Sequence, residues 1–124
     1  MLNLEPFEKL DRLIHERGRL AIMSLLAASE SLTFTEVKGT LGLTDGNLSV
    51  HIRKLEEAGY VSVDKQFVDR KPRTSYALTS PGRAAFALYI GALEEIVKQS
   101  QPVDDPAERG AGPVLLQPGV AGAK

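Results

Sequence analysis

Polar and basic side chains gather in two short segments of this chain. The first is residues 44–58, an expected helix whose outward face combines small, polar and basic residues: Gly46, Asn47, Ser49, Val50, Arg53 and Lys54. The second is residues 65–73, which hold one anion, Asp69, against four cations: Lys65, Arg70, Lys71 and Arg73. Asn and Ser hydrogen-bond to base edges, and Lys and Arg neutralise phosphates. Together the two segments have the chemistry of nucleic-acid binding.

Other chemistries lack the residues that they need. The chain has no Cys, which excludes a disulfide scaffold, a thiolate zinc site and a cysteine nucleophile. Its two His, His15 and His51, are too few and too far apart to indicate a metal site. The glycines at positions 39, 42 and 46 do not form the G-x-G-x-x-G pattern of dinucleotide binding. We therefore expect no enzyme, no cofactor and no metal ion.

Size and composition favour one soluble domain. The chain has 124 residues, a net charge of −1 and 43% hydrophobic residues. Its apolar runs fall short of the ~20 residues that a membrane span needs. The first residues lack the charged-then-apolar order of a signal peptide. We expect a cytoplasmic protein that does not enter a membrane.

The composition changes near residue 100. Residues 101–124 are rich in Pro and Gly, with four of each, and are expected to form a disordered tail. The domain is then residues 1–100, which hold 13 of the 15 basic and 13 of the 16 acidic residues. Because this domain is neutral as a whole, the case for nucleic acid depends on where its positive charges lie.

Helical spacing of apolar residues predicts the elements of the first half. A first helix is expected over residues 7–14, after Pro6, and a second over residues 20–26, after Gly18. A short extended piece is expected at residues 32–34. We read the N-terminal part of the domain as helical.

Two further helices flank a tight turn. Thr35 is expected to cap a third, short helix that ends at Gly42. Thr44 is a good N-cap for the fourth helix, in which Leu48, Ile52 and Leu55 recur on one face, and Gly59 ends it. Two helices joined by residues 42–44 alone form a helix-turn-helix.

The hydrophobic period then changes from 3.6 to 2. Apolar residues alternate over residues 61–68 and again over 75–78, which predicts two strands. The polar turn between them, residues 69–73, makes the segment 60–79 a basic hairpin, and Thr79 with Pro81 starts a last helix. The fold class is therefore α+β, mainly α: a winged helix-turn-helix. A helix fits the major groove of DNA, and a projecting hairpin can reach phosphates or the minor groove.

Three segments resemble winged-helix transcriptional regulators related to the MarR and ArsR groups. Residues 43–61 (LTDGNLSVHIRKLEEAGYV) look like their recognition helix. Residues 70–79 (RKPRTSYALT) with 82–86 (GRAAF) look like their wing and following helix, and His15 with residues 19–22 match the start. The resemblance covers residues 7–97. It implies a homodimeric bacterial or archaeal DNA-binding repressor or activator.

The resemblance also implies roles for individual residues. The base-contacting positions of the family correspond here to Asp45, Gly46, Asn47, Ser49 and Val50. Its backbone contacts correspond to Arg53, Lys54 and the wing cations Arg70, Lys71 and Arg73. For Asp45, stabilising the helix N-terminus is favoured over accepting from a cytosine amine, because phosphate repels its carboxylate. The cysteine metal sensors of ArsR members are absent, and the chain is shorter than typical MarR members, so neither metal sensing nor the MarR ligand pocket is carried over to this chain and the effector stays unknown.

The last helix carries more apolar surface than one small domain can bury. We therefore expect flanking N- and C-terminal helices to form a homodimer through Leu4, Phe7, Leu10, Tyr89, Leu93 and Ile96. The partner would be double-stranded DNA at a near-palindromic operator, since a twofold dimer reads two half-sites. The alternative is a winged helix that contacts another protein and has no role in DNA binding, a module that would not need a basic wing.

Overall fold

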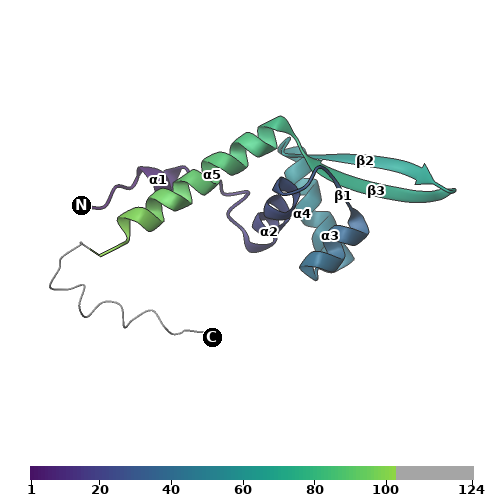
Figure 1. Cartoon of the computed structure of the whole chain (residues 1–124), viewed down its shortest axis with the longest axis horizontal. Helices are drawn as coiled ribbons and strands as arrows, with labels where there is room; N and C mark the ends of the chain where they lie inside the picture. Colours follow the sequence, from purple (N-terminus) through teal and green to yellow (C-terminus); the bar gives the residue numbers. More distant parts are fainter. Residues whose placement is uncertain (103–124) are drawn as a thin grey trace.

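The structure, a computed structural model, describes residues 1–102 and has the expected fold class: mainly helical, with a three-stranded antiparallel sheet. In chain order its elements are α1 (Glu5–Glu8), α2 (Arg17–Ala27), β1 (Leu32–Thr33), α3 (Phe34–Leu41), α4 (Asp45–Glu57), β2 (Val61–Val68), β3 (Lys71–Leu78) and α5 (Ser80–Gln99) (Figure 1). The expected tail lies outside the described residues from position 103 onward. Over the described part, no helix is both long enough and apolar enough to cross a membrane.

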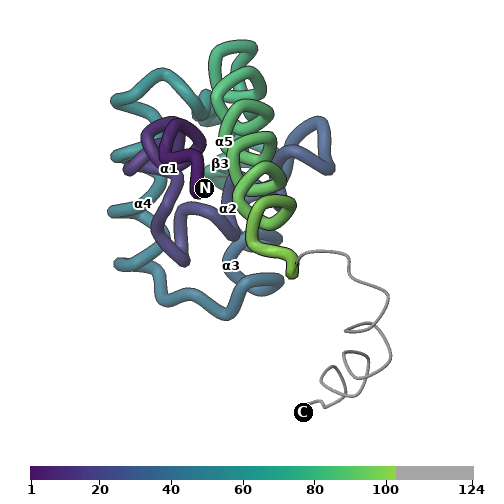
Figure 2. Tube along the Cα trace, turned by 90° about the vertical axis from the view of Figure 1, so that its left-hand side faces the viewer, coloured from purple at the N-terminus to yellow at the C-terminus, as the bar shows by residue number. Residues whose placement is uncertain are grey.

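The helices and the hairpin form three parts (Figure 1). Helices α2, α3 and α4 make a central body. The hairpin of β2 and β3, here called the wing, projects from one end of it. Helix α1 and the C-terminal half of α5, here called the arm, extend from the other end, and Figure 2 shows them side by side. Asn3 and Gln99 join the two by a pair of hydrogen bonds of 2.8 Å.

One apolar core connects the body to both projections. Each helix of the body contributes buried side chains, and so do the sheet, α5 and the segment between α1 and α2: Ile14, Ile22, Met23, Leu26, Val37, Leu48, Ile52, Leu55, Val61, Tyr76, Leu78 and Tyr89. The expected buried face of α4 is confirmed by Leu48, Ile52 and Leu55. Burial of a side chain of this size contributes roughly 1.5–3 kcal/mol, so this stripe fixes which face of α4 is left outward.

Threonine residues cap the last three helices. Thr44 and Thr79 do so as predicted, and their hydroxyls accept hydrogen bonds from the backbone N–H groups of the third helical residue. For α3 the predicted cap, Thr35, is wrong. Thr33 takes the position because its hydroxyl accepts from Glu36 N at 3.1 Å while the Glu36 carboxylate accepts from Thr33 N at 2.9 Å. This reciprocal pair satisfies two donors, which one Thr without a partner cannot do.

The expected first helix over residues 7–14 is wrong in length, because α1 ends at Glu8. The carboxylate of Asp11 accepts from the N–H groups of Leu13 at 2.8 Å and Ile14 at 3.3 Å. A side chain that captures these donors replaces the helical carbonyls. Helix α2 in turn begins earlier than predicted, at Arg17, because the Glu16 carboxylate caps it.

The turn of the wing is shorter than predicted. Strands β2 and β3 pair as far as Val68 and Lys71, so Asp69 and Arg70 alone connect them. Both have positive φ, 52° and 68°, as the commonest two-residue hairpin turn requires. Pro72, which we placed in the turn, lies within β3.

Candidate nucleic-acid interface

The face of α4 opposite the core is open to solvent. The residues predicted to lie there are all exposed: Gly46, Asn47, Ser49, Val50, Arg53 and Lys54. They run from small and polar at the N-terminal end to basic in the middle of the helix. The cap at Thr44 fixes where this face begins, because its hydroxyl holds the N–H of Asn47 at 3.1 Å. The helix therefore presents an exposed face that is polar and basic apart from Val50.

Asn47 and Ser49 keep their side chains free. Within residues 1–102, neither side chain makes a hydrogen bond to another protein group, whereas the backbone N–H of Asn47 is already used by the cap. An Asn side chain offers a donor and an acceptor in one plane, and a Ser hydroxyl offers both on one atom. This pair can therefore contact base edges without breaking an internal bond.

Asp45 is exposed at the same end of α4, but its carboxylate has a partner. Its Oδ1 lies 2.6 Å from Nζ of Lys38 on α3. This ion pair joins the two helices of the helix-turn-helix and leaves a negative charge at the positive N-terminus of α4. Its setting differs from that of Asn47 and Ser49, since the carboxylate already takes part in an internal contact.

The wing exposes its cations, and no carboxylate of the described residues forms an ion pair with them. Arg70 lies in the turn, and Lys65, Lys71 and Arg73 lie on the strands, all exposed. Among the described residues, none of the four has a carboxylate within ion-pairing distance. Since side chains alternate along a strand, Lys71 and Arg73 share one side of the wing. A projecting hairpin with unpaired cations is suited to phosphates.

The wing also carries an aromatic residue that the sequence did not mark as a binding residue. Phe67 is 78% exposed and lies opposite Pro72 in the strand register. It belongs to the row of β2 that starts with Val61 in the core, but none of the helices within residues 1–102 packs over the far end of that row. The sequence did contain a signal for Phe67: an apolar residue near the tip of the hairpin lies too far from the helices to be buried by them.

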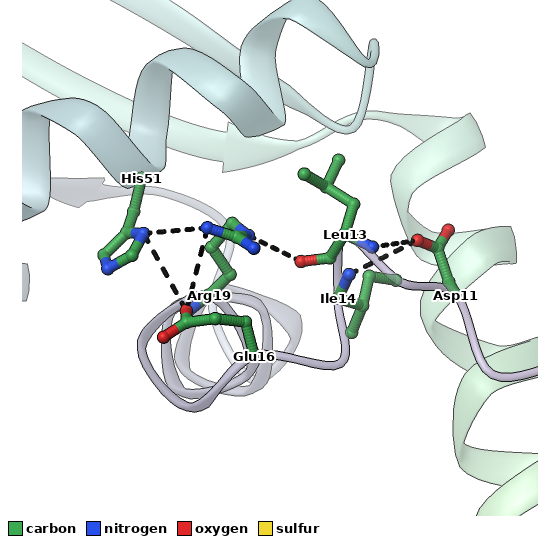
Figure 3. Close-up of polar contacts among 6 residues, drawn as sticks. All are labelled: Asp11, Leu13, Ile14, Glu16, Arg19 and His51. Atoms are coloured by element: carbon green, nitrogen blue, oxygen red, sulfur yellow. Dashed lines mark hydrogen bonds and ion pairs between the residues drawn. The ribbon is translucent and has the colours of Figure 1, made fainter.

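A polar cluster beneath the outward face connects α4 to α2 (Figure 3). A terminal nitrogen of Arg19 lies 3.2 Å from Nδ1 of His51, and the Glu16 carboxylate lies 3.8 Å from both side chains. The N–H of Arg19 donates to that carboxylate at 2.8 Å and holds the pKa of Glu16 below its ordinary value. His51, which directly follows the exposed Val50 on α4, is half-buried. Spacing in the sequence gave no hint of its partners.

The residues predicted for dimerisation lie in different environments. Leu4 and Phe7 are exposed on the arm, whereas Leu10, Leu93 and Ile96 are half-buried. Tyr89 is 1% exposed, so its assignment to the interface is wrong. It packs in the chain's own core, and its hydroxyl lies 2.5 Å from Nδ1 of His15.

The apolar surface of α5 extends beyond the residues predicted for dimerisation. Ile90, Leu93 and Val97 line an open groove along α5, and the polar residues at its rim are Glu94, Lys98 and Gln101. Val97 is 59% exposed. The arm thus offers apolar surface on α5 as well as on α1.

Comparisons with known proteins agree with this geometry. Residues 19–97 match the model of the winged helix DNA-binding domain family. An uncharacterized protein of Methanocaldococcus jannaschii is 39% identical over 80 residues, which are 64% of this chain and 87% of the relative. The structure of a transcriptional regulator homologue from Pyrococcus horikoshii OT3 is 29% identical, with a TM-score of 0.74 over 79% of this chain and 99% of that one. MarR, at 17% identity, shares the fold with a TM-score of 0.65 over 87% of this chain and 78% of that one.

Proposed function

Because the chain belongs to the winged helix DNA-binding domain family, we propose that it is a dimeric transcriptional regulator that binds specific sites in double-stranded DNA. The single observation that carries this proposal is the outward face of α4, which is exposed, polar and basic while its opposite face is buried. A helix with such a face fits the major groove, where each base pair presents a distinct set of donors and acceptors. Residues 1–100 act as one unit in this proposal.

Each outward residue of α4 has a part in the complex. Asn47 and Ser49 read base edges, because their side chains are free and lie near the end of the helix that enters the groove. Gly46 lets the backbone approach the DNA, and Val50 offers apolar contact to a thymine methyl group. Arg53 and Lys54 lie further along α4 and neutralise phosphates.

Asp45 supports the start of the recognition helix and does not itself read bases. Its carboxylate pairs with Lys38 at 2.6 Å and so holds α3 against the start of α4. A carboxylate at a helix N-terminus also interacts favourably with the helix dipole.

The wing supplies affinity. Arg70, Lys71 and Arg73 are exposed and unpaired among the described residues, so their charges are available to the phosphate backbone. Contacts of this kind add binding free energy on any sequence and little discrimination.

A second copy of the chain covers the arm. Apolar residues are exposed just before α1 at Leu4 and on α5 at Val97, beside the groove of Ile90 and Leu93. A twofold pairing of two arms would hold two α4 helices about one turn of DNA apart, ~34 Å, which suits a near-palindromic operator. Such a regulator works in the cytoplasm, where the DNA of a bacterium or archaeon lies, and catalyses no reaction.

Selection of bound sites from a random duplex library tests the proposal. We expect an enriched, near-palindromic sequence, here called the operator, that binds more tightly than a shuffled duplex, with both affinities falling as salt rises. No enrichment and no duplex binding at low salt would contradict it. That result would favour the alternative, in which the winged helix contacts another protein.

A further inference from the structure

The segment that joins the arm to the body is held to the recognition helix α4 at two places, its middle and the chain just after its C-terminal end. This segment, residues 9–16, is here called the connector. Its Asp11 carboxylate accepts from the hydroxyl of Tyr60, just after α4, at 2.5 Å. Its Leu13 carbonyl accepts from Nε of Arg19 at 2.6 Å, and the same guanidinium lies 3.2 Å from His51 in the middle of α4. Figure 3 shows Arg19 placed between the connector and α4.

The chemistry of the Arg19 contact fixes its direction. A guanidinium has donors and no acceptor, so Arg19 is the donor in this contact and Nδ1 of His51 is the acceptor. The Arg19 side chain is 12% exposed, and a charge so far from water is stable only with partners. Glu16 supplies the opposite charge, and Leu13 and His51 supply the acceptors. Arg19 therefore has little freedom to move without moving the groups that it joins.

Gly18 allows α4 to lie this close to α2. A Cβ atom on Gly18 would stand 2.7 Å from Nε2 and 2.9 Å from Cδ2 of His51. Contacts under 3.0 Å force a shift, here of a half-buried ring whose other side is held by Arg19 and Glu16. The position of His51 thus depends on the absence of a side chain on α2.

We propose that Arg19 is a positioning residue for DNA recognition: by joining the connector to His51, it makes the placement of the arm set the angle at which α4 presents Asn47 and Ser49. His51 lies one helical turn after Asn47, so a displaced ring rotates or shifts the base-reading end of α4. The inference rests on the proposed function. It adds that discrimination between DNA sequences depends on a contact remote from the DNA.

A double-mutant cycle between Gly18 and His51 tests the contact. Gly18→Ala is expected to weaken binding to the operator by about 3- to 30-fold and to leave binding to a shuffled duplex unchanged. In the His51→Ala background the ring is gone and only Glu16 Oε1 stays near the added Cβ, at 3.3 Å, so Gly18→Ala should then change operator affinity by less than about twofold. Equal reductions of operator affinity in both backgrounds would overturn the inference.

Arg19→Gln tests the link to the connector. Arg12→Gln, on the exposed surface of the connector, is the matched control because it also removes one positive charge. We expect Arg19→Gln to reduce the ratio of operator to shuffled-duplex affinity by about 3- to 30-fold, and Arg12→Gln to leave that ratio unchanged. Equal ratios for both variants would mean that Arg19 contributes charge alone.

Two measurements distinguish a loss of the Arg19 coupling from misfolding of a variant and from failure of the proposed function. Thermal melting of each variant reports folding, and if Arg19→Gln does not fold, the Gly18–His51 cycle decides. The wild-type chain reports the proposed function: if it does not distinguish the operator from the shuffled duplex, that function fails. If the wild type discriminates and the variants do so equally well, the coupling through Arg19 fails alone.

Discussion

Helices α4 and α5 are built alike but leave opposite chemistry at the surface. Both begin at a Thr cap and both bury a stripe in the same core, through Leu48, Ile52 and Leu55 on α4 and Tyr89 and Ala92 on α5. The free face of α4 is polar and basic, whereas α5 exposes apolar side chains at Leu88 and Val97. A buried stripe shows that a helix packs on its own domain. The chemistry of its exposed face indicates which kind of molecule binds there.

The two helices also differ in how they are held. The N-terminus of α4 is joined to α3 by the Lys38–Asp45 ion pair, and its middle is joined to α2 by His51. The C-terminal half of α5 extends beyond the body and lies against α1 (Figure 1). A helix that must meet bases with fixed geometry is clamped to the body. A helix that pairs with a second copy can extend away from it.

The largest effect is expected from a charge on the free face of α5. Val97→Glu should separate the dimer, because a second copy would otherwise bury an unpaired carboxylate. Operator affinity should then fall by roughly 10²- to 10⁴-fold, since two linked half-sites no longer bind together. Sedimentation velocity measures the mass, and circular dichroism checks the fold.

Ala84→Glu is the matched control for the arm. It adds the same charge at an exposed position of α5 outside the groove and should leave the dimer intact. A folded Val97→Glu variant that stays dimeric and binds the operator normally would place the interface elsewhere. We choose Val97 rather than Leu93 because Leu93 also packs on the core, so a charge there would disturb folding as well as pairing.

The next largest effect is expected from the wing. Replacing Arg70, Lys71 and Arg73 together by Ala should weaken binding to any duplex on the order of 100-fold at about 0.1 M salt. The slope of log affinity against log salt should flatten by about 0.9 for each phosphate that the wing no longer neutralises. Titrations at several salt concentrations measure both. An unchanged slope would show that the wing does not contact the DNA phosphates.

A smaller and more selective effect is expected from Asn47. Asn47→Ala should cost ~1–3 kcal/mol on the operator and much less on a shuffled duplex, because a hydrogen bond to a base adds affinity only where the correct base is present. Anisotropy titrations of both duplexes measure the difference. Equal reductions on the two duplexes would show that Asn47 positions the backbone and does not read sequence.

The smallest effect is expected from Phe67. Since this side chain is 78% exposed, Phe67→Ala should leave the melting temperature unchanged. Duplex affinity should fall about threefold, because the ring would otherwise be partly buried against the sugars of the groove. The salt slope should not move, unlike that of the triple wing variant. An affinity equal to that of the wild type would leave Phe67 outside the DNA contact.

Local signals predicted α4 better than any other element. Its Thr44 cap, its apolar spacing and the Gly59 that follows it are all encoded within a few residues, and the exposed face followed from that spacing. The wing was found by its alternation, but its turn was not. Two non-glycine residues with positive φ leave no clear pattern, and Pro72 suggested a turn where the structure has a strand.

Two kinds of error occurred: local side-chain hydrogen bonds moved helix ends, and contacts between distant residues decided which side chains are buried. Asp11 ends the first helix by bonding nearby N–H groups, a choice supported from across the fold by Tyr60. Periodicity showed that α5 has surplus apolar surface but not which side turns inward, so Tyr89 was misplaced. The contact between Arg19 and His51 joins residues 32 positions apart, and no spacing rule within one helix predicts it.

Methylation protection on the operator is the sharpest test of the proposed docking of α4, because dimethyl sulfate reports guanine N7 in the major groove and adenine N3 in the minor groove. With α4 in the major groove and two copies bound, we predict two patches of protected guanine N7 about 10 base pairs apart, both on one side of the duplex. Asn47→Ala should weaken both patches together, since each copy presents the same residue. Bound complexes in which guanine N7 stays fully reactive would contradict this docking, because α4 would then lie outside the major groove.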